Sequence, residues 1–370
     1  MRILLVWEYY PSYLDDFYRR NPDAHRLPFA EQNQLLLEDG FLWNAYLVPE
    51  FRKLGHQAEA YVANAAPLQA VWARENGIGG SASRLDILRE QIRAYRPDVL
   101  WIGGAPQLLG EFLRSVQGYC GAVVAWRAAA GGELLDWTGV DCVLSSHENF
   151  VQAFRRMGLR SELVLPCVDP QWASECLAAA GQRDCDVTFY GTLNVALFAN
   201  RLKLLSTVTR HVRCNIHSDR WRWQRRPKPL GSFLRQFRYV PFRLRTRFAP
   251  PAYGRELMQL IAESKIVLNA HVDSAGGLAG NIRMFEVTAM GALLVTDACA
   301  NLAKIFEPER EVVTYRNPAA AVEKLRYYLR HREERKAIAR AGQQRTLRCY
   351  NSSIRAGEVL QIFNSIAPGA

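Results

Sequence analysis

The chain has 370 residues, of which 49% are hydrophobic and 22% are charged, and its formal net charge at pH 7 is +11. This length suits two domains of roughly 170 to 190 residues, and the composition is that of a globular protein rather than a disordered one. No apolar run reaches the roughly 20 residues that a membrane-spanning helix needs, which argues against an integral membrane protein.

In the first half, short apolar runs alternate with helical stretches. The run Ile3–Trp7 is too short for a signal peptide and is expected to form the first strand. Helices are expected in NAYLVPEFRKLG (44–55) and SRLDILREQIRAYRPD (83–98). Further strands are expected at 58–63, 99–103, 123–126, 140–145 and 163–165. This alternation is typical of a parallel sheet covered by helices on both faces.

The second half repeats the pattern. We expect an amino-terminal domain at 1–168 and a linker at 169–181. A new series of strands then begins with DVTFYG and continues through VRCNI, KIVLNA, ALLVT and VVTY. It predicts a second Rossmann-like domain at 182–350, and a helix within 351–370 is expected to pack back on the first domain.

The eight cysteines and seven histidines are scattered, without a CxxC pair or a zinc-ligand spacing. We therefore expect reduced thiols, a cytoplasmic location, and neither a metal nor a cofactor. Asp184 and Asp186 form the sequence DCD, a pattern that can hold a divalent ion on a sugar diphosphate. Because the triplet precedes a strand instead of ending one, it is more typical of a solvated turn.

The positive charge is concentrated in the segment 210–250, which holds twelve Lys and Arg against one acidic residue, Asp219. The rest of the chain carries 35 basic and 35 acidic side chains. Seven aromatic residues lie among the arginines: Trp221, Trp223, Phe233, Phe237, Tyr239, Phe242 and Phe248. This composition suits an anionic membrane surface or a lipid-linked acceptor, and also single-stranded nucleic acid, which we consider the least favoured partner. The alternative is an irregular insertion whose rings pack on the domain.

The stretch GNIRMFEVTAMG (280–291) is the most informative part of the chain. Ile282, Phe285 and Ala289 have helical spacing toward a core, which leaves Arg283 and Glu286 together on another face. The preceding Gly276, Gly277 and Gly280, with Asn281, let backbone approach a ligand and open the helix N-terminus to an anion. Arg283 could bind phosphate and Glu286 could accept hydrogen bonds from ribose. A glycine-rich turn with a surface ion pair remains the alternative.

Ligands of open α/β sheets bind beyond the carboxyl ends of the strands. In the second domain this rule selects Gly191, Thr192, His271 and Asp297, and in the first domain it selects Glu8 and His147. Each of these could instead be an ordinary turn or capping residue. GGAPQLLG (103–110) lacks the glycine spacing of a dinucleotide site, which argues against a nicotinamide enzyme.

These residues lie in a sequence that resembles the CgeB-like, spore-maturation type of glycosyltransferases, a branch of the GT-B superfamily with two facing Rossmann-like domains. The likeness is nearly continuous from GNIRMFEVTAMGALLVTD to YYLRHREERKAIARAG, and looser in VLSSHENFVQAFRRMG of the first half. It implies that the carboxy-terminal domain binds a nucleotide sugar, with Arg283 on the diphosphate and Glu286 on the ribose, while the amino-terminal domain binds the acceptor. GT-B enzymes also stabilise the leaving diphosphate without a bound metal.

The chain departs from the resemblance at two places. Leu278 stands where related retaining enzymes often carry a first glutamate, and Cys349-Tyr350-Asn351 stands where a His-Thr-Tyr triplet is frequent. Retention or inversion is therefore undecided, and an inverting enzyme needs a general base, for which Glu8 and His147 are the candidates.

We expect a glycosyltransferase that transfers a sugar from a nucleotide diphosphate sugar to a glycan, a lipid-linked molecule or a protein, at a cell-surface polysaccharide for example. It is expected in the cytoplasm, either free or held at the inner membrane face by 210–250. The alternatives are a non-catalytic protein that binds nucleotide sugars, membranes or nucleic acid, and a nucleotide-sugar epimerase on the same fold.

Overall fold

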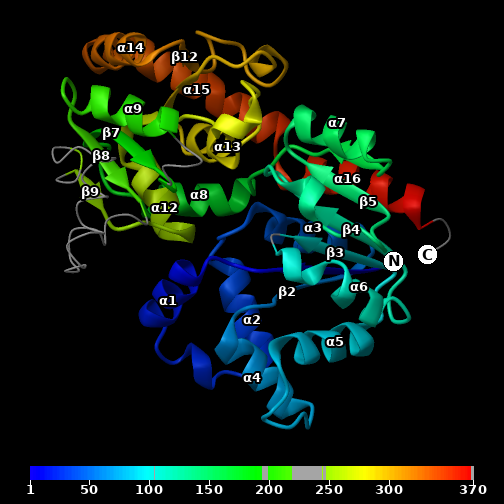
Figure 1. The fold of residues 1–370 in the computed structure, drawn as a ribbon. Coiled ribbons are helices and arrows are strands. Elements are labelled where there is room, and N and C mark those ends of the chain that lie inside the picture. The colour runs from blue at the N-terminus through cyan, green and yellow to red at the C-terminus, as the bar shows by residue number, and fades with distance from the viewer. Residues whose placement is uncertain (104, 194–198, 219–243, 245–246, 368–370) are drawn as a thin grey trace, which may run out of the picture. The chain divides into compact units, whose positions relative to one another are not determined.

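The computed structural model describes residues 1–103, 105–193, 199–218, 244 and 247–367. The chain separates into two compact units, drawn in Figure 1. Unit 1 comprises residues 1–167 and 352–370, and unit 2 comprises residues 168–351. The boundary at 168 expected from the sequence lies beside the observed end of the first segment of unit 1, Cys167.

Unit 1 contains a six-stranded sheet in the order β2-β1-β3-β4-β5-β6, with every neighbouring pair parallel. Its strands are β1 (Arg2–Trp7), β2 (Gln57–Val62), β3 (Val99–Gly103), β4 (Ala122–Trp126), β5 (Cys142–Ser145) and β6 (Ser161–Leu163). Its helices are α1 (Pro11–Arg20), α2 (Phe29–Glu38), α3 (Leu47–Lys53), α4 (Ala66–Glu75), α5 (Arg84–Tyr95), α6 (Glu111–Val116), α7 (Glu148–Arg156) and α16 (Ser352–Ile366).

Both faces of this sheet are buried, which explains the nearly unbroken apolar strands. On one face, Leu4 and Val6 of β1 share a core with the apolar sides of α5, α6 and α7. On the other, Trp101 of β3 and Phe51 of α3 lie 5.7 and 6.0 Å, ring to ring, from Phe363 of α16. The carboxy-terminal helix, red in Figure 1, therefore completes the core of unit 1.

Unit 2 contains a second parallel six-stranded sheet, in the order β12-β11-β10-β7-β8-β9. Its strands are β7 (Cys185–Tyr190), β8 (Cys214–His217), β9 (Phe248–Ala249), β10 (Ser264–Leu268), β11 (Leu293–Asp297) and β12 (Val313–Tyr315). Its helices are α8 (Pro170–Ala179), α9 (Ala199–Val208), α12 (Gly254–Ala262), α13 (Ile282–Ala289), α14 (Pro318–Arg330) and α15 (Arg332–Cys349).

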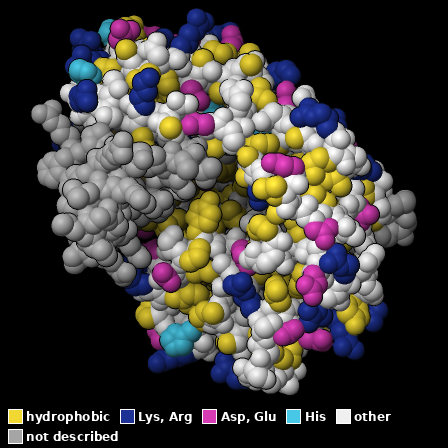
Figure 2. Space-filling model, in the orientation of Figure 1, with side chains coloured by type: hydrophobic (Ala, Val, Ile, Leu, Met, Phe, Trp, Pro, Cys, Tyr) yellow, Lys and Arg dark blue, Asp and Glu magenta, His cyan; other side chains and the backbone are white. Residues whose placement is uncertain are grey.

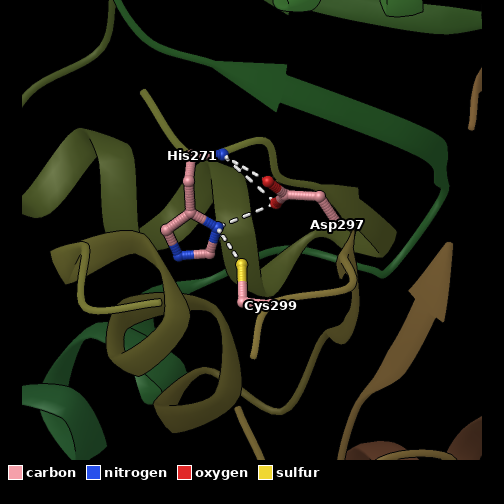
Figure 3. A group of neighbouring side chains, drawn as sticks. All are labelled: His271, Asp297 and Cys299. Carbon is pink, nitrogen blue, oxygen red and sulfur yellow. Dashed lines mark hydrogen bonds and ion pairs between the residues drawn. The ribbon is translucent and has the colours of Figure 1, made fainter. Parts of the chain in front are cut away.

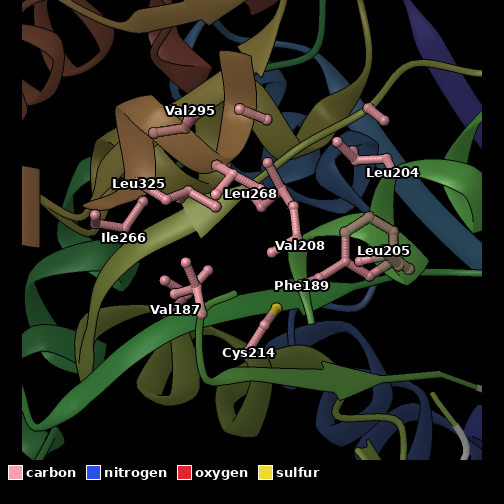
Figure 4. Packing of buried hydrophobic residues seen from close by; sticks show 14 of the residues in the cluster. Val187, Phe189, Leu204, Leu205, Val208, Cys214, Ile266, Leu268, Val295 and Leu325 are labelled. Carbon is pink, nitrogen blue, oxygen red and sulfur yellow. The ribbon is translucent and has the colours of Figure 1, made fainter. Parts of the chain in front are cut away.

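The core on one face of this sheet joins strand residues to α9 and α14 (Figure 4). Val187 and Phe189 of β7 alternate with residues of the opposite face and pack with Leu205 of α9 and Leu325 of α14. On the other face α13 packs against α12 and α15. The α/β fold with two parallel sheets that the sequence predicted is confirmed.

Residues 169–181, which the sequence analysis expected to form a linker, contain helix α8. The Asp169 side chain accepts a hydrogen bond of 2.7 Å from the Trp172 backbone N–H, and Pro170 occupies the first helical turn. Trp172, Ala173 and Cys176 are buried, and α8 packs on α12. The capping residue Asp169, the proline after it and the apolar face of Trp172, Ala173 and Cys176 are local sequence features that predict a helix.

The basic segment 210–250 lies mostly outside the described residues. Its described ends contain β8 and β9, so the segment connects two adjacent strands of the unit 2 sheet. The ring of Phe248 is buried in the unit 2 core, whereas the other six aromatic residues of the segment lie outside the described residues. On the face drawn in Figure 2, Lys and Arg side chains are interspersed with carboxylates, in keeping with the balanced charge of the rest of the chain. No helix in the described part of the chain combines the length and apolarity needed to cross a membrane.

Candidate functional site

The candidate site lies in unit 2, where the strand order reverses between β7 and β10. Parallel α/β sheets bind ligands at such a switch point, because the loops that follow the two strands leave in opposite directions. Gly191 and Thr192 follow β7, His271 follows β10, and Asp297 ends β11. The structure therefore brings these four residues to the same edge of one sheet.

Helix α13 begins at this edge. Asn281 is its N-cap residue, in an extended backbone conformation, but its side chain makes no capping hydrogen bond. It bonds to Asn269 instead, with Asn281 Nδ2 3.0 Å from Asn269 Oδ1. The first-turn N–H groups of a helix have no intrahelical acceptor, so the N-terminus of α13 can receive an anion.

Arg283 and Glu286 lie on the same side of α13, against Tyr190 at the end of β7. The Tyr190 hydroxyl donates a hydrogen bond of 2.7 Å to Glu286 Oε2. The Arg283 guanidinium carbon lies 5.4 Å from the centre of the Tyr190 ring. The sequence analysis placed the two charged residues on one face, and the structure adds the tyrosine that holds them.

Gly191 leaves room for the Arg283 side chain. An added Cβ at Gly191 would lie 2.2 Å from Arg283 Nη2 and 2.8 Å from its guanidinium carbon. The backbone of Gly191 also has φ +137°, a conformation that L residues rarely adopt. The guanidinium therefore lies directly over the backbone at the end of β7, where a ligand at the switch point would be in reach.

Asn269, fully buried at the end of β10, connects the surrounding elements. Its Nδ2 donates to Thr296 Oγ1 of β11 at 3.0 Å, and its Oδ1 accepts from Asn281 and, at 3.4 Å, from Arg283 Nη1. One buried amide thereby holds β10, β11 and the start of α13 together.

His271, Asp297 and Cys299 form a second group at this edge (Figure 3). Asp297 Oδ1 lies 2.8 Å from His271 Nδ1 and also accepts from the His271 backbone N–H at 3.1 Å. Cys299 Sγ lies 3.5 Å from the same His271 Nδ1. Because both neighbours meet the same ring nitrogen, the three residues do not form the relay of a nucleophile, a base and an orienting acid.

The same three residues offer ligand atoms within 4.8 Å of one another, a spacing that could hold a metal ion. Their hydrogen bonds also give them a structural role, because Asp297 ties the end of β11 to the loop after β10. Burial opposes the charge of Asp297, but the hydrogen bonds and the charge of His271 outweigh it and lower the pKa of Asp297.

The electrostatics of the site favour a bound anion. Burial raises the pKa of Glu286, and the hydrogen bond from Tyr190 and the charge of Arg283 counteract only part of that rise. Burial, and then the nearby charge of Arg283, lower the pKa of Arg201, a buried residue of α9. A buried guanidinium whose charge is disfavoured in this way becomes more stable when an anion lies beside it.

Comparisons with known proteins agree with this architecture. Residues 200–361, less than half of the chain, match the family model Glyco_trans_1_2, described as glycosyl transferase-like. No curated protein sequence matches the chain significantly.

Solved structures match almost the whole chain. A glycosyltransferase from Rickettsia africae is 10% identical, with a TM-score of 0.57 over 100% of this chain and 99% of that one. Anabaena HepE, solved with UDP-glucose, is 10% identical, with a TM-score of 0.60 over 99% and 100%. Sucrose-phosphate synthase from Thermosynechococcus elongatus is 10% identical, with a TM-score of 0.57 over 100% of both chains.

The chain has the GT-B fold. At such low identity the likeness establishes the fold alone, since one fold supports many activities. In GT-B terms, the glycine loop, α13 and the ends of β7, β10 and β11 all belong to the second Rossmann-like unit.

The two candidate bases lie in the first Rossmann-like unit, and the structure does not bring them together. Glu8 follows β1, and His147 precedes α7 after β5. Because β3 and β4 lie between these strands in the sheet, the strand ends are about 14 Å apart. Glu8 and His147 are therefore alternatives and cannot act on one atom together.

Each candidate base has its own partners. Glu8 Oε2 accepts from Gln107 Nε2 at 2.6 Å, and Glu8 Oε1 lies 3.3 Å from Arg84 Nη2. His147 is buried, with Nδ1 3.0 Å from Ser146 Oγ and its ring edge against Phe150. The Glu8 carboxylate is thus engaged by Arg84 and Gln107, whereas the His147 ring is buried beside Ser146 and Phe150.

Three residues of the unit 2 site were missed by the sequence reasoning: Tyr190, Arg201 and Asn269. Tyr190 and Asn269 stand at strand ends, so the strand-end rule could have selected them. Arg201 had no such signal. Its guanidinium reaches the carbonyl oxygens of Ala270, at 2.9 Å, and Thr192, at 3.2 Å, and only the packing of α9 on the sheet makes this possible.

Proposed function

We propose that the protein is a glycosyltransferase that moves a sugar from a nucleotide diphosphate sugar to a glycan, a lipid-linked molecule or a protein. The observation that carries the proposal is the position of Arg283. Its guanidinium lies over Gly191 at the switch point, next to Glu286 and the open N-terminus of α13. The glycosyl transferase-like match of residues 200–361 supports it. We further propose that the chain belongs to the CgeB-like branch that its sequence resembles.

The donor diphosphate would lie between Arg283 and the first turn of α13. Arg283 would bind phosphate oxygens with two parallel N–H donors, and the helix N-terminus would add backbone N–H groups. Arg201, which donates a hydrogen bond to the Thr192 carbonyl in the loop after β7, would contribute a further positive charge. Gly280 would let the backbone that precedes Asn281 come close to the ligand.

Glu286 would bind the ribose. Its Oε2 accepts a hydrogen bond from Tyr190, and among the described residues its Oε1 takes part in no hydrogen bond or ion pair. A carboxylate in this position would accept hydrogen bonds from the ribose hydroxyl groups. Burial raises the pKa of Glu286. A hydrogen bond from a ribose hydroxyl would stabilise the buried carboxylate.

Glycosyl transfer requires stabilisation of the charge that forms on the leaving diphosphate. We propose that Arg283, Arg201 and α13 supply it without a metal ion. One well-placed donor of this kind contributes about 10²-fold or more to the rate. Thr192, His271 and Asp297 would shape the loops around the donor, with Asp297 holding His271 in place.

Deprotonation of the acceptor hydroxyl would fall to a residue of unit 1 if the enzyme inverts configuration. We propose His147 over Glu8, because the Glu8 carboxylate is bound by Arg84 and Gln107. A general base contributes about 10² to 10⁴-fold. A rate that falls at least 100-fold in His147→Ala, while the affinity for the nucleotide is unchanged, is the expected result.

The acceptor would be anionic or membrane-linked if the segment 210–250 engages it, and the protein would then act at the inner membrane face. Deletion of the whole segment would remove β8 and β9, so charge neutralisation within 220–243 is the better test. Glutamine in place of its eight Lys and Arg residues should reduce sedimentation with phosphatidylglycerol vesicles and leave donor hydrolysis unchanged.

The decisive experiment is a panel of nucleoside diphosphates and nucleotide sugars, which starts with UDP and UDP-glucose because Anabaena HepE was solved with UDP-glucose. We expect at least one nucleotide to raise the melting temperature and one nucleotide sugar to be hydrolysed slowly. Glu286→Ala should abolish the rise. A melting temperature that uridine, guanosine and thymidine diphosphates all leave unchanged would count against the proposal. Conversion of one nucleotide sugar into its epimer without hydrolysis would indicate an epimerase.

A further inference from the structure

A pocket lies in unit 2 at the amino-terminal ends of the strands, at the sheet edge opposite to the proposed donor site. Asp184 precedes β7, Lys265 lies at the start of β10, and Gly291 precedes β11. The pocket has a volume of about 790 Å³, within the range of roughly 300 to 1,000 Å³ of small-molecule sites. Helix α15 forms its other wall.

The lining is strongly basic. It contains six cationic side chains and one carboxylate, Asp184, and the six cations are Arg183, Lys265, Arg332, Arg335, Lys336 and Arg340. Two of them have acidic partners: Lys265 pairs with Asp186 at 2.6 Å, and the exposed Lys336 lies 3.5 Å from Glu333. Within the part of the chain that the structure describes, the other four form no ion pair.

Two of the four are explained by the fold. Arg183 donates to the carbonyl oxygens of Gly291 at 2.6 Å and Met290 at 2.9 Å, just beyond the end of α13. Arg335 donates to the Tyr328 carbonyl at 2.7 Å, in the last turn of α14. Cations at helix carboxyl ends satisfy carbonyl groups that have no intrahelical partner. These contacts also hold both guanidinium groups rigidly at the pocket wall.

The row Arg332, Lys336 and Arg340 has no such explanation. The three exposed side chains recur every four residues, so they share one face of α15 along about 12 Å. Like charges at this spacing destabilise a helix. The rigid arginines increase the repulsion: burial, and then the charge of Arg335, lower the pKa of Arg183, and burial, and then the charge of Arg332, lower the pKa of Arg335.

We propose that this pocket binds an anion with several phosphate groups, held by Arg332, Lys336 and Arg340. Guanidinium groups pair with phosphate oxygens through two parallel hydrogen bonds, and a row of cations can contact successive phosphates. A single phosphate would reach one or two of the three side chains. The ligand is a soluble polyphosphorylated molecule or a phosphorylated lipid headgroup, which present the same chemistry.

Calorimetric titration of the full chain with inorganic tripolyphosphate tests the site. The double variant Arg332→Ala/Arg340→Ala is expected to bind tripolyphosphate at least about tenfold more weakly. Arg348→Ala, an exposed arginine of the same helix outside the pocket, is the matched control and should leave binding unchanged. Arg283→Ala should also leave it unchanged, since that residue lies at the opposite edge of the sheet.

Sedimentation with vesicles distinguishes the two sources. Binding to vesicles that contain a phosphoinositide, but not to neutral phosphatidylcholine vesicles, with loss in the double variant, indicates a lipid headgroup. Binding of tripolyphosphate alone indicates a soluble ligand. The proposal is overturned if neither probe binds, if the double variant binds within about twofold of the unaltered protein, or if Arg283→Ala removes the binding. None of these outcomes depends on glycosyl transfer.

Discussion

Substitution of Gly191 by alanine tests the central contact of the donor site. The new methyl carbon would lie 2.2 Å from Arg283 Nη2, whereas ordinary contact begins at 3.4 Å. The guanidinium must therefore move by more than about 1 Å, and a misplacement of this size can reduce catalysis about 10²-fold. That loss corresponds to about 2.7 kcal/mol of transition-state stabilisation.

The same substitution also strains the backbone, because φ at Gly191 is +137°. A non-glycine residue in such a conformation destabilises the fold by about 1 to 3 kcal/mol. Gly158→Ala separates the two effects. Gly158 has φ +81° with no atom within 4 Å of an added Cβ, so its alanine variant should lose stability without a change in nucleotide affinity.

Isothermal titration with the nucleoside diphosphate that raises the melting temperature most is the assay, followed by donor hydrolysis. We expect Gly191→Ala to weaken binding strongly and Gly158→Ala to leave it within about twofold. In an Arg283→Ala background, Gly191→Ala should cause little further loss, because the displaced side chain is already gone. An equal loss in both backgrounds would refute the proposed contact.

Three further predictions concern stability and metal dependence. The folded pKa of Glu286 lies above its ordinary value of 4.5, so its contribution to stability is present below that value and is lost as the pH rises through the folded pKa. Glu286→Gln should therefore raise the melting temperature more at about pH 8 than at about pH 5, while it abolishes the nucleotide-induced rise; an equal gain at both pH values would contradict this. Phe285 is fully buried, and its ring centre lies 4.9 Å from that of Tyr350. Phe285→Ala should therefore lower the free energy of unfolding by about 3 to 5 kcal/mol in a denaturant titration. A decrease below about 1 kcal/mol would show that neighbouring side chains fill the space left by the ring. EDTA should leave donor hydrolysis within about twofold, and a loss above about tenfold that Mg²⁺ or Mn²⁺ restores would assign a metal to the reaction.

The strand and helix pattern was sufficient to predict the two parallel sheets. Strands buried on both faces read as short apolar runs, and helices between them have a distinct period, so the alternation is visible locally. The segment ends were less certain. The sequence placed the last strand of unit 1 at 163–165, whereas β6 covers Ser161–Leu163, because a short apolar run does not define its own register.

The spacing of Arg283 and Glu286 also predicted their common face on α13, because helical geometry alone determines it. The rule that ligands bind at carboxyl strand ends selected Gly191 and Asp297 for the same reason: it needs only the strand and its direction. The roles of these residues in binding a donor stay predictions until the nucleotide titrations are done.

Local sequence could not determine which distant residues meet. The Tyr190 hydroxyl reaches Glu286 across 96 positions of the chain, and Arg201 reaches the loops after β7 and β10 from a helix of its own. Glu8 and His147 both follow strands, yet the strand order separates them, which no local pattern reveals. The sequence by itself determined the fold class and the charged face of α13, because both depend on periodicity along the chain. Only the tertiary structure decided that Gly191 makes room for Arg283, and that six cations surround one pocket, because both depend on segments brought together by the sheet order.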